Sequence, residues 1–157
     1  MSTPSLNGHR TLPPPPVEVV EPPLLRPLAE ITADLSRPLP PNLLKTRKQG
    51  GQTITYIPWY TVNRLLDRFA PGWEGSVAQM SFTGERVFVV YSLTIPALEG
   101  RFTRQATGTE VLKELDRNGQ VRELSFGDPG SRAESMAFRR AAARFGLGLY
   151  LYNRPHD

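Results

Sequence analysis

The sequence predicts an α+β fold: a three-stranded antiparallel β-meander packed against a long helix (a β-β-β-α core), preceded by a short helix and a proline-rich arm. Two strand-like segments, 73–82 and 86–98, flank the glycine-containing link 83–85, a pattern typical of an antiparallel hairpin. Segment 131–146, SRAESMAFRRAAARFG, contains no proline and repeats its apolar residues at helical spacing. The 157 residues suffice for one such domain and a tail.

Proline separates the arm from the domain. Residues 1–44 contain 11 of the 16 prolines, including the run Pro13 to Pro16, and such a run favours extended polyproline geometry. We therefore predict a flexible arm over residues 1–26 and one domain over residues 27–157. A short helix is expected at 28–36, ended by Pro38.

The next segments follow strand and helix patterns in turn. TITYI, residues 53–57, is β-branched and aromatic and predicts a strand. Pro58 suits the first turn of a helix, and the apolar residues of 59–69 recur at helical spacing. Residues 101–110 alternate in character and predict the third strand of the meander.

The region between the meander and the long helix is less regular. Asn118-Gly119 favours a hairpin between its flanking segments, although both flanks also suit a helix. Asp128-Pro129-Gly130-Ser131 predicts a loop that ends in an N-cap, and Gly146 and Gly148 end the helix that follows.

Composition excludes several classes of site. The chain has no cysteine, and its two histidines, His9 and His156, lie in the terminal segments. Disulfide frameworks, thiolate zinc sites and histidine-based catalysis are therefore not expected. No apolar run reaches membrane-spanning length, and the N-terminus lacks the apolar core of a signal peptide. We expect a cytoplasmic protein with no cofactor, no metal and no membrane contact.

The predicted long helix has two unlike sides. On a helical projection four arginines share an arc of roughly 140°: Arg132, Arg139, Arg140 and Arg144. The small apolar residues opposite them would let the helix lie close to the sheet, with the arginines projecting as a ridge. An ordinary solvated surface would explain the arginines on composition alone. The helix has a single glutamate, however, and arginine is the better donor to phosphate, which favours a phosphate ligand.

A second basic cluster precedes the first predicted strand. Lys45, Arg47 and Lys48 come just before Gly50-Gly51, and residues 45–157 hold 16 basic but only 11 acidic residues. The cluster is either an ordinary charged loop or a flexible backbone that approaches a phosphodiester chain. The aromatic residues that follow could stack on bases or pack in the core. We predict a core position for Trp59 and leave Tyr56 open.

Two blocks of the chain carry recognisable motifs. The first block is RKQGGQTITYIPWYTVNRLLDRFAPGWEGSV, with its basic residue, Gly-Gly-Gln turn, Tyr-Ile pair and Gly-x-x-Trp-like end. The second is Arg139-Arg140-Ala141 followed by Phe145-Gly146. Together the blocks resemble the RAD52-type single-strand annealing protein superfamily, which has Lys-Arg-Ala and Phe-Gly in the second block and includes the bacterial DNA damage response protein A (DdrA). Length and the proline-rich start favour the DdrA branch.

The resemblance implies a ring of subunits with single-stranded DNA in a basic groove. Arg139 and Arg140 match the helix cations at the floor of that groove, and Arg47 and Tyr56 match its basic and aromatic residues. A third helix cation of the family falls on Ala143. The predicted DNA-binding residues are therefore Lys45, Arg47, Lys48, Tyr56, Arg132, Arg139, Arg140 and Arg144.

The function expected from this resemblance is single-stranded DNA binding and strand annealing in double-strand break repair and DNA end protection. It would need no ATP, in keeping with the lack of a G-x-x-x-x-G-K-[ST] loop. The expected partners are single-stranded DNA and further copies of the chain, with no small-molecule substrate, at a bacterial nucleoid. The alternative is a sequence-independent single-stranded DNA or RNA binding module without annealing activity.

Two rival classes were weighed. A nuclease would need converging carboxylates, and the best candidates lie in one segment: Glu110, Glu114, Asp116, Glu123 and Asp128. Basic residues are interleaved with them, so an ordinary mixed-charge surface is the simpler interpretation and we predict no enzyme. The second rival class is a scaffold protein whose arginine ridge binds an acidic protein.

Overall fold

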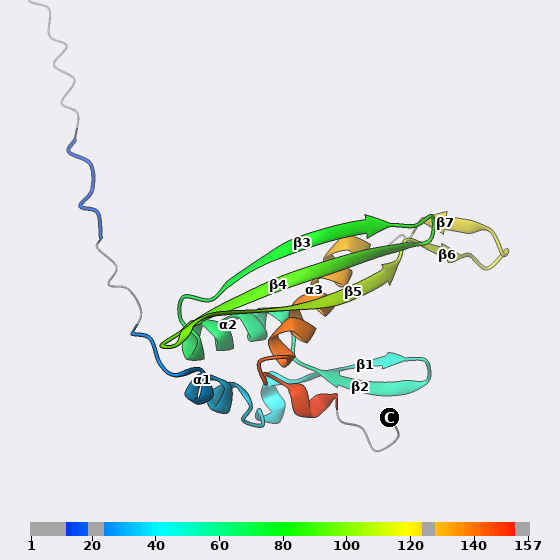
Figure 1. Ribbon diagram of the computed structural model, residues 1–157. Coiled ribbons are helices and arrows are strands. Elements are labelled where there is room, and N and C mark those ends of the chain that lie inside the picture. The colour runs from blue at the N-terminus through cyan, green and yellow to red at the C-terminus, as the bar shows by residue number, and fades with distance from the viewer. Residues whose placement is uncertain (1–11, 19–23, 124–127, 153–157) are drawn as a thin grey trace, which may run out of the picture.

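The computed structural model describes residues 12–18, 24–123 and 128–152, and its centre is a three-stranded antiparallel sheet with one long helix across a face (Figure 1). The sheet order is β3-β4-β5. This confirms the predicted α+β class. In chain order the elements are α1 (Leu28–Leu35), a 3-10 turn (Pro41–Leu43), β1 (Lys45–Gln49), β2 (Gln52–Tyr56), α2 (Trp59–Phe69), β3 (Glu74–Phe82), β4 (Arg86–Ala97), β5 (Gly100–Val111), β6 (Lys113–Leu115), β7 (Val121–Glu123), α3 (Pro129–Ala143) and a second 3-10 turn (Leu149–Leu151).

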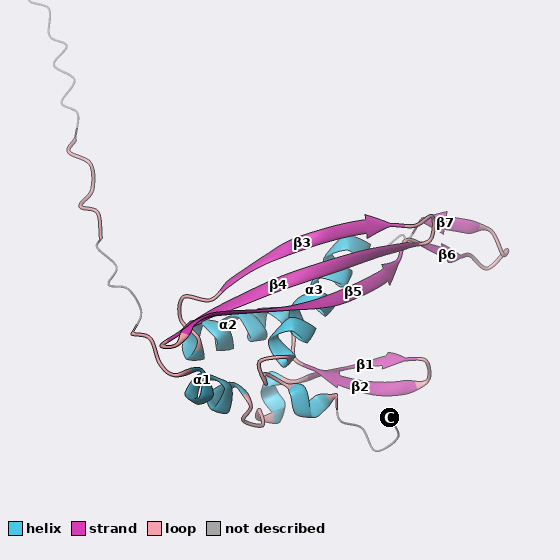
Figure 2. Cartoon of the chain, viewed as in Figure 1, coloured by secondary structure: helices cyan, strands magenta, loops and turns pink. Residues whose placement is uncertain are grey.

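The core lies between α3 and the central strand β4. Every second residue of β4 is buried, from Val87 through Leu93 to Ala97, because one face of the strand packs under the helix. α3 lies mainly over β4 and β5, and β3 forms the outer edge (Figures 1 and 2). β3 shares the helix side of the sheet through pairs such as Phe82 with Val87, yet all nine of its residues are exposed.

The helix approaches the sheet to backbone contact. Gly108 of β5 is buried, and a Cβ atom placed on it would overlap the carbonyl oxygen of Ala133 and the amide nitrogen of Ala137. Ala133, Ala137 and Ala141 are each 0% exposed. This confirms that small helix residues permit close packing, and it adds Gly108 as their counterpart on the sheet.

Two small hairpins flank the main sheet (Figure 2). β1 and β2 pair through a turn at Gly50 and Gly51, whose φ angles of +57° and +77° are open to glycine. The prediction of a charged loop or flexible backbone at 45–48 is therefore wrong, because this segment is a strand. β6 and β7 form the hairpin favoured by Asn118-Gly119, and the helical alternative for its flanks is wrong.

The helix boundaries follow local hydrogen bonding. α1 and α2 lie where the sequence predicted them. The predicted N-cap of α3 at Ser131 is wrong, because the Asp128 carboxylate accepts hydrogen bonds from the backbone N–H of Gly130 at 3.0 Å and of Ser131 at 3.3 Å. Pro129 then occupies the first helical position, where its missing N–H costs nothing.

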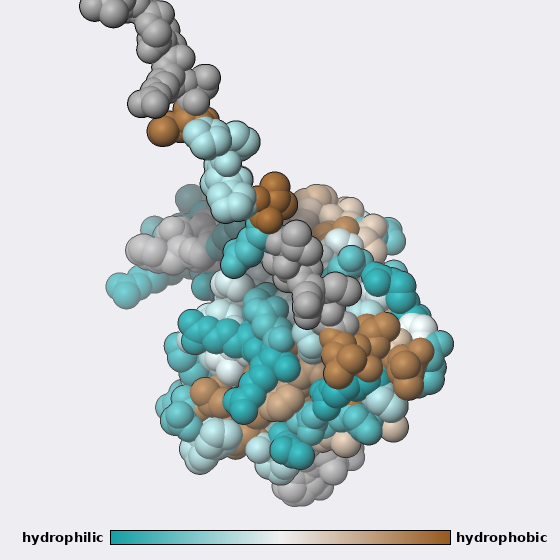
Figure 3. Space-filling view, turned by 90° about the vertical axis from the view of Figure 1, so that its left-hand side faces the viewer, coloured by the Kyte–Doolittle hydropathy of each residue, from teal (hydrophilic) through white to brown (hydrophobic). Residues whose placement is uncertain are grey.

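Arg26 attaches the segment before α1 to the folded domain. Its guanidinium donates to Asp34 at 2.7 Å and to the carbonyl of Phe69 at 2.8 Å, joining α1 to the end of α2. Residues 12–18 are exposed and without regular structure. The division into an arm over 1–26 and a domain stays a prediction. On the end of the molecule from which the arm leaves, hydrophobic side chains gather in small patches among hydrophilic ones (Figure 3).

Candidate nucleic-acid interface

Cationic side chains from the β1–β2 hairpin and from α3 meet at Tyr56. The Cζ atom of Arg47 lies 5.3 Å from the centroid of the Tyr56 ring, and the Cζ atom of Arg139 lies 5.1 Å from it. Both distances are within the range of a cation–π interaction. Tyr56 is the last residue of β2, so the hairpin carries the ring to the arginine side of α3.

A groove runs along this junction. A pocket of about 100 Å³ is lined by residues of the hairpin and of α3, among them Arg47, Tyr56, Arg139 and Arg140. Leu147, Gly148 and Tyr152 from the chain after α3 complete it.

The groove continues toward the C-terminal end of α3. A second hollow, of about 230 Å³, shares Arg140 and Tyr152 with the first and extends to Ala143 and Arg144. The two hollows together reach from Arg47 to Arg144.

The charges in the groove are crowded. The pKa of Arg139 is lowered, first by burial and then by the positive charge of Arg47. The pKa of Tyr152 is raised by desolvation of its phenol group, although 47% of the residue is exposed, and the nearby arginines oppose that shift. Such crowding favours an anionic ligand, because an anion would relieve the repulsion between Arg47 and Arg139.

No carboxylate neutralises these arginines in the part of the chain that the structure describes. The ion pairs there involve Arg26, Arg37, Arg101 and Arg122, and none involves Arg47, Arg139, Arg140 or Arg144. Acidic residues near basic ones are otherwise common in this chain. The groove is therefore a site of concentrated positive charge, which suits a polyanion.

Two arginines fix the end of α3 to β5. Arg140 donates through Nη1 to the carbonyl of Thr107 at 3.1 Å, which uses one of its five N–H donors. Arg104 of β5 donates to the carbonyl of Arg144, and its guanidinium lies 4.5 Å from the Phe145 ring. Arg104 was not among the residues predicted from the sequence. The only signal for it is a basic residue between Phe102 and Ala106 in a strand pattern.

The other predicted residues lie around the groove. Lys45 is at the start of β1, and its ammonium is 5.5 Å from the Tyr60 ring. Lys48 lies on the opposite side of β1 from Arg47, because neighbouring strand residues alternate. Arg132 is exposed about two helical turns before Arg139 and lines neither hollow. The structure therefore brings together Arg47, Tyr56, Arg139 and Arg140, with Arg144 at one end.

Two expectations about side chains are corrected. Trp59 is 52% exposed rather than in the core, because it begins α2 and the buried side of that helix is formed by residues such as Val62 and Leu66. The arginines of α3 do not all project as a ridge, since Arg139 is partly buried and its guanidinium lies by Tyr56.

Three of the carboxylates considered for a nuclease have structural contacts. Glu114 pairs with Arg122 at 3.0 Å, and Oδ1 of Asp116 accepts from the backbone N–H groups of Asn118 and Gln120, both at 2.8 Å. Asp128 caps α3. Within the described ranges, no three acidic, histidine or cysteine side chains are grouped to hold a metal ion. Across those same ranges no helix is long and apolar enough to cross a membrane.

The fold and groove define a β-β-β-α domain with a basic groove, and sequence comparisons identify its family. Residues 27–157 match the Rad52/22 family double-strand break repair protein. The chain therefore belongs to the Rad52/22 family.

Two curated relatives come from Arabidopsis thaliana. DNA repair RAD52-like protein 1, mitochondrial, is 41% identical over 130 residues, which cover 82% of this chain and 69% of that protein. DNA repair RAD52-like protein 2, chloroplastic, is 41% identical over 134 residues, which cover 83% of this chain and 63% of that protein. These matches support the RAD52-type superfamily, while the DdrA branch and the cellular location stay predictions.

Proposed function

We propose that this chain binds single-stranded DNA along the Arg47–Arg144 groove and anneals complementary strands, without ATP, in the repair and protection of broken DNA. The observation that carries the proposal is the convergence of Arg47 and Arg139 on Tyr56, next to Arg140, with no neutralising carboxylate among the described ion pairs. Membership of a double-strand break repair family supports the same role.

The chemistry of the groove suits annealing. Arginines that neutralise phosphates release counterions, so affinity falls as salt rises. Contacts to phosphate and sugar carry no base information, which leaves bases free to pair and binding independent of sequence. The pairing of bases then supplies the driving free energy, and nothing has to be hydrolysed.

An oligomer, and a ring in particular, is part of the proposal. The helix side of β3 carries exposed apolar side chains, with Val77 at 38%, Met80 at 46% and Phe82 at 64% exposure. β3 is also an edge strand, whose outer side has free backbone groups for pairing. A second copy that covers this strip would bury these side chains and pair with the free edge of β3.

The test is the variant Arg139→Ala with Arg140→Ala, measured with fluorescent oligothymidylate at several salt concentrations. The Kd is expected to rise roughly 10-fold or more at low salt, and the slope of log K against log salt to flatten by about one for each lost phosphate contact. The matched control is Arg101→Ala with Arg117→Ala, which removes the same charge from exposed sites away from the groove. Particle images of both variants report whether the oligomer survives.

Annealing is measured separately, from the rate at which two complementary oligonucleotides pair. The groove variant is expected to lose this acceleration and the control to keep it. An unchanged salt slope in the groove variant would contradict the groove. Tight DNA binding by the wild type without faster pairing would instead favour a single-strand binding module.

A further inference from the structure

A cluster of exposed aromatic and basic residues lies on the first turns of α2, outside the groove. Trp59 is 52% exposed and Tyr60 37% exposed, and their ring centroids are 5.9 Å apart in an edge-to-face arrangement of 79°. Large aromatic side chains normally bury most of their area. Here the core contacts of α2 come from other residues, so packing does not explain the position of Trp59.

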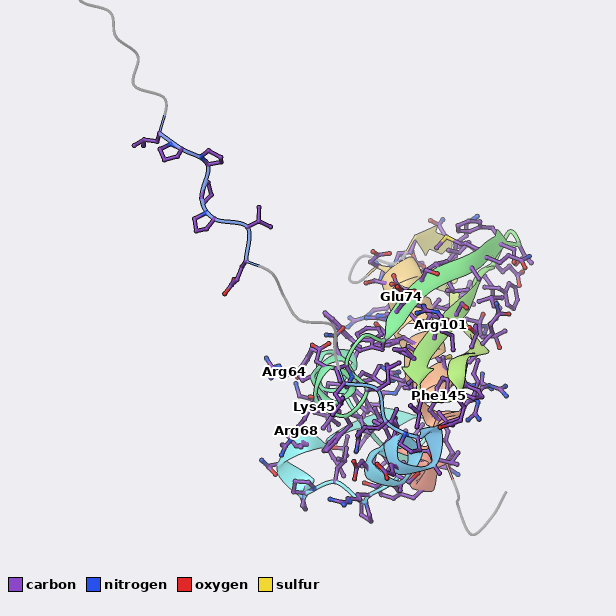
Figure 4. All side chains as sticks on the ribbon, turned by 60° about the vertical axis from the view of Figure 1, so that its left-hand side comes forward. Lys45, Arg64, Arg68, Glu74, Arg101 and Phe145 are labelled. Carbon is purple, nitrogen blue, oxygen red and sulfur yellow. The ribbon has the colours of Figure 1, made fainter. Side chains whose placement is uncertain are left out.

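Cations surround the Tyr60 ring from two elements. Nζ of Lys45, from β1, lies 5.5 Å from the ring centroid, and Cζ of Arg64, one turn further along α2, lies 5.8 Å from it. Arg68 follows another turn along and is also exposed. Figure 4 shows Lys45, Arg64 and Arg68 on the same side of the molecule. The nearby acid, Asp67, accepts hydrogen bonds from Asn63 and Trp73.

Lys45 connects this cluster to the groove. It is paired with Tyr56 across the β1–β2 hairpin. Its pKa is raised, mainly by the neighbouring Tyr60 hydroxyl group. Cations and rings therefore alternate from Arg64 through Tyr60, Lys45 and Tyr56 to the arginines of the groove.

We propose that Trp59, Tyr60 and Arg64 extend the single-stranded DNA track beyond the groove: bases stack on the two rings while Lys45 and Arg64 neutralise the phosphates between them. A hollow beside Trp59, lined by Ser131, Glu134, Ser135 and Phe138, gives a base room against the indole. Its hydroxyl and carboxylate groups can accept hydrogen bonds from N–H groups on base edges, including the N3–H of thymine, and do not suit phosphates. Exposed rings alternating with cations match a flexible strand that offers both bases and charge. The inference rests on the proposed function.

Fluorescence gives a direct readout, because the chain has only two tryptophans, Trp59 and Trp73. In the full-length Trp73→Phe protein, titration with oligothymidylate is expected to quench the emission of Trp59, since a stacked base lies against the indole. Trp59→Leu with Tyr60→Leu, on the natural background, is expected to raise the Kd for the same oligonucleotide roughly 30-fold or more with little change in its salt slope.

The charge contribution has its own variant. Arg64→Ala is expected to lower the salt slope by about one. Its matched control is Arg101→Ala, which removes the same charge from the sheet, where Arg101 pairs with Glu74 at 2.7 Å (Figure 4). Circular dichroism melting checks that each variant folds.

The outcomes separate the two proposals. If the groove variant binds DNA weakly but Trp59 emission does not change and the Trp59 and Tyr60 variant binds normally, the α2 cluster is not part of the track, and a protein becomes its favoured partner. If the wild-type chain itself does not bind oligothymidylate at low salt, the proposed function fails and this inference fails with it.

Discussion

The two long sides of α3 solve different problems. One side packs on the sheet with alanine against glycine, so closely that Gly108 has no room for a Cβ atom. The other side carries arginines. One of them, Arg139, contacts the Tyr56 ring, and both residues line a pocket. At Gly108 the first side leaves no space for a side chain, whereas the second side has a pocket and several arginines.

The comparison shows how one helix can be held rigidly and still offer free donors. Backbone-to-backbone packing fixes the helix axis without using long side chains. The arginines therefore do not have to hold the helix on the sheet, apart from the single bond between Arg140 and Thr107. Stability and ligand binding should then respond to different substitutions on the same helix.

The largest expected effect is a loss of stability from a substitution on the packed side. Gly108→Ala places a methyl group against the backbone at Ala133 and Ala137, so helix and sheet must move apart. We expect the free energy of unfolding to fall by about 1–3 kcal/mol, as for an overpacked core. The measurement is chemical denaturation. Gly84→Ala is the matched control, because nothing lies within 4 Å of a Cβ atom there. Equal stability of the two variants would show that the close contact does not matter.

The packed side was largely predictable and the hairpins less so. Alanines at helical spacing predict that this side of the helix packs closely on a neighbouring element, because small side chains let backbones approach. The partner Gly108 lies within an alternating strand and has no local signal, since its role depends on a helix that comes later in the chain. The sequence predicts a loop at 45–48 because this charged segment comes just before two glycines, and only its pairing with β2 makes it a strand.

The next effect concerns the arginine side. Tyr56→Leu removes the ring shared by Arg47 and Arg139. We expect affinity for oligothymidylate to fall roughly 10-fold, because Arg47 and Arg139 lose the ring that positions them, while the salt slope stays unchanged. Unfolding free energy should fall by about 1 kcal/mol. Tyr56→Phe keeps the ring and should bind like wild type. Weak binding by the phenylalanine variant would show that the hydroxyl, and not the ring, matters.

The site could be predicted in part. Arginine spacing on the helix, and the resemblance of its second block, indicated Arg139 and Arg140, and the structure brings both to the groove with Arg47. The same spacing treats Arg132 as equivalent to Arg139, yet Arg132 lines neither hollow, so only tertiary structure separates the two residues. Aromatic residues usually lie in the core, so the sequence places Trp59 there. The structure leaves it exposed, because Trp59 is at the first position of α2 and other residues of that helix face the core.

The smallest expected effect is on the pH dependence of stability, which a tyrosine on each side of α3 should influence at high pH. Burial raises the pKa of Tyr91, on the packed side, above 10.0, and the charge of Glu134 adds to the shift. Burial also raises the pKa of Tyr152, in the groove, although arginines oppose it. A raised phenol pKa means that the unfolded chain loses its proton first. The stability is therefore fully present below about pH 10 and falls as the pH rises further. The free energy of unfolding, measured at about pH 8 and about pH 11, should fall less with pH in Tyr91→Phe than in wild type. Tyr152→Phe should reduce this fall as well, but by less, because Tyr91 is only 8% exposed. A larger effect of Tyr152→Phe than of Tyr91→Phe would show that the loss of stability at high pH comes mainly from the arginine side.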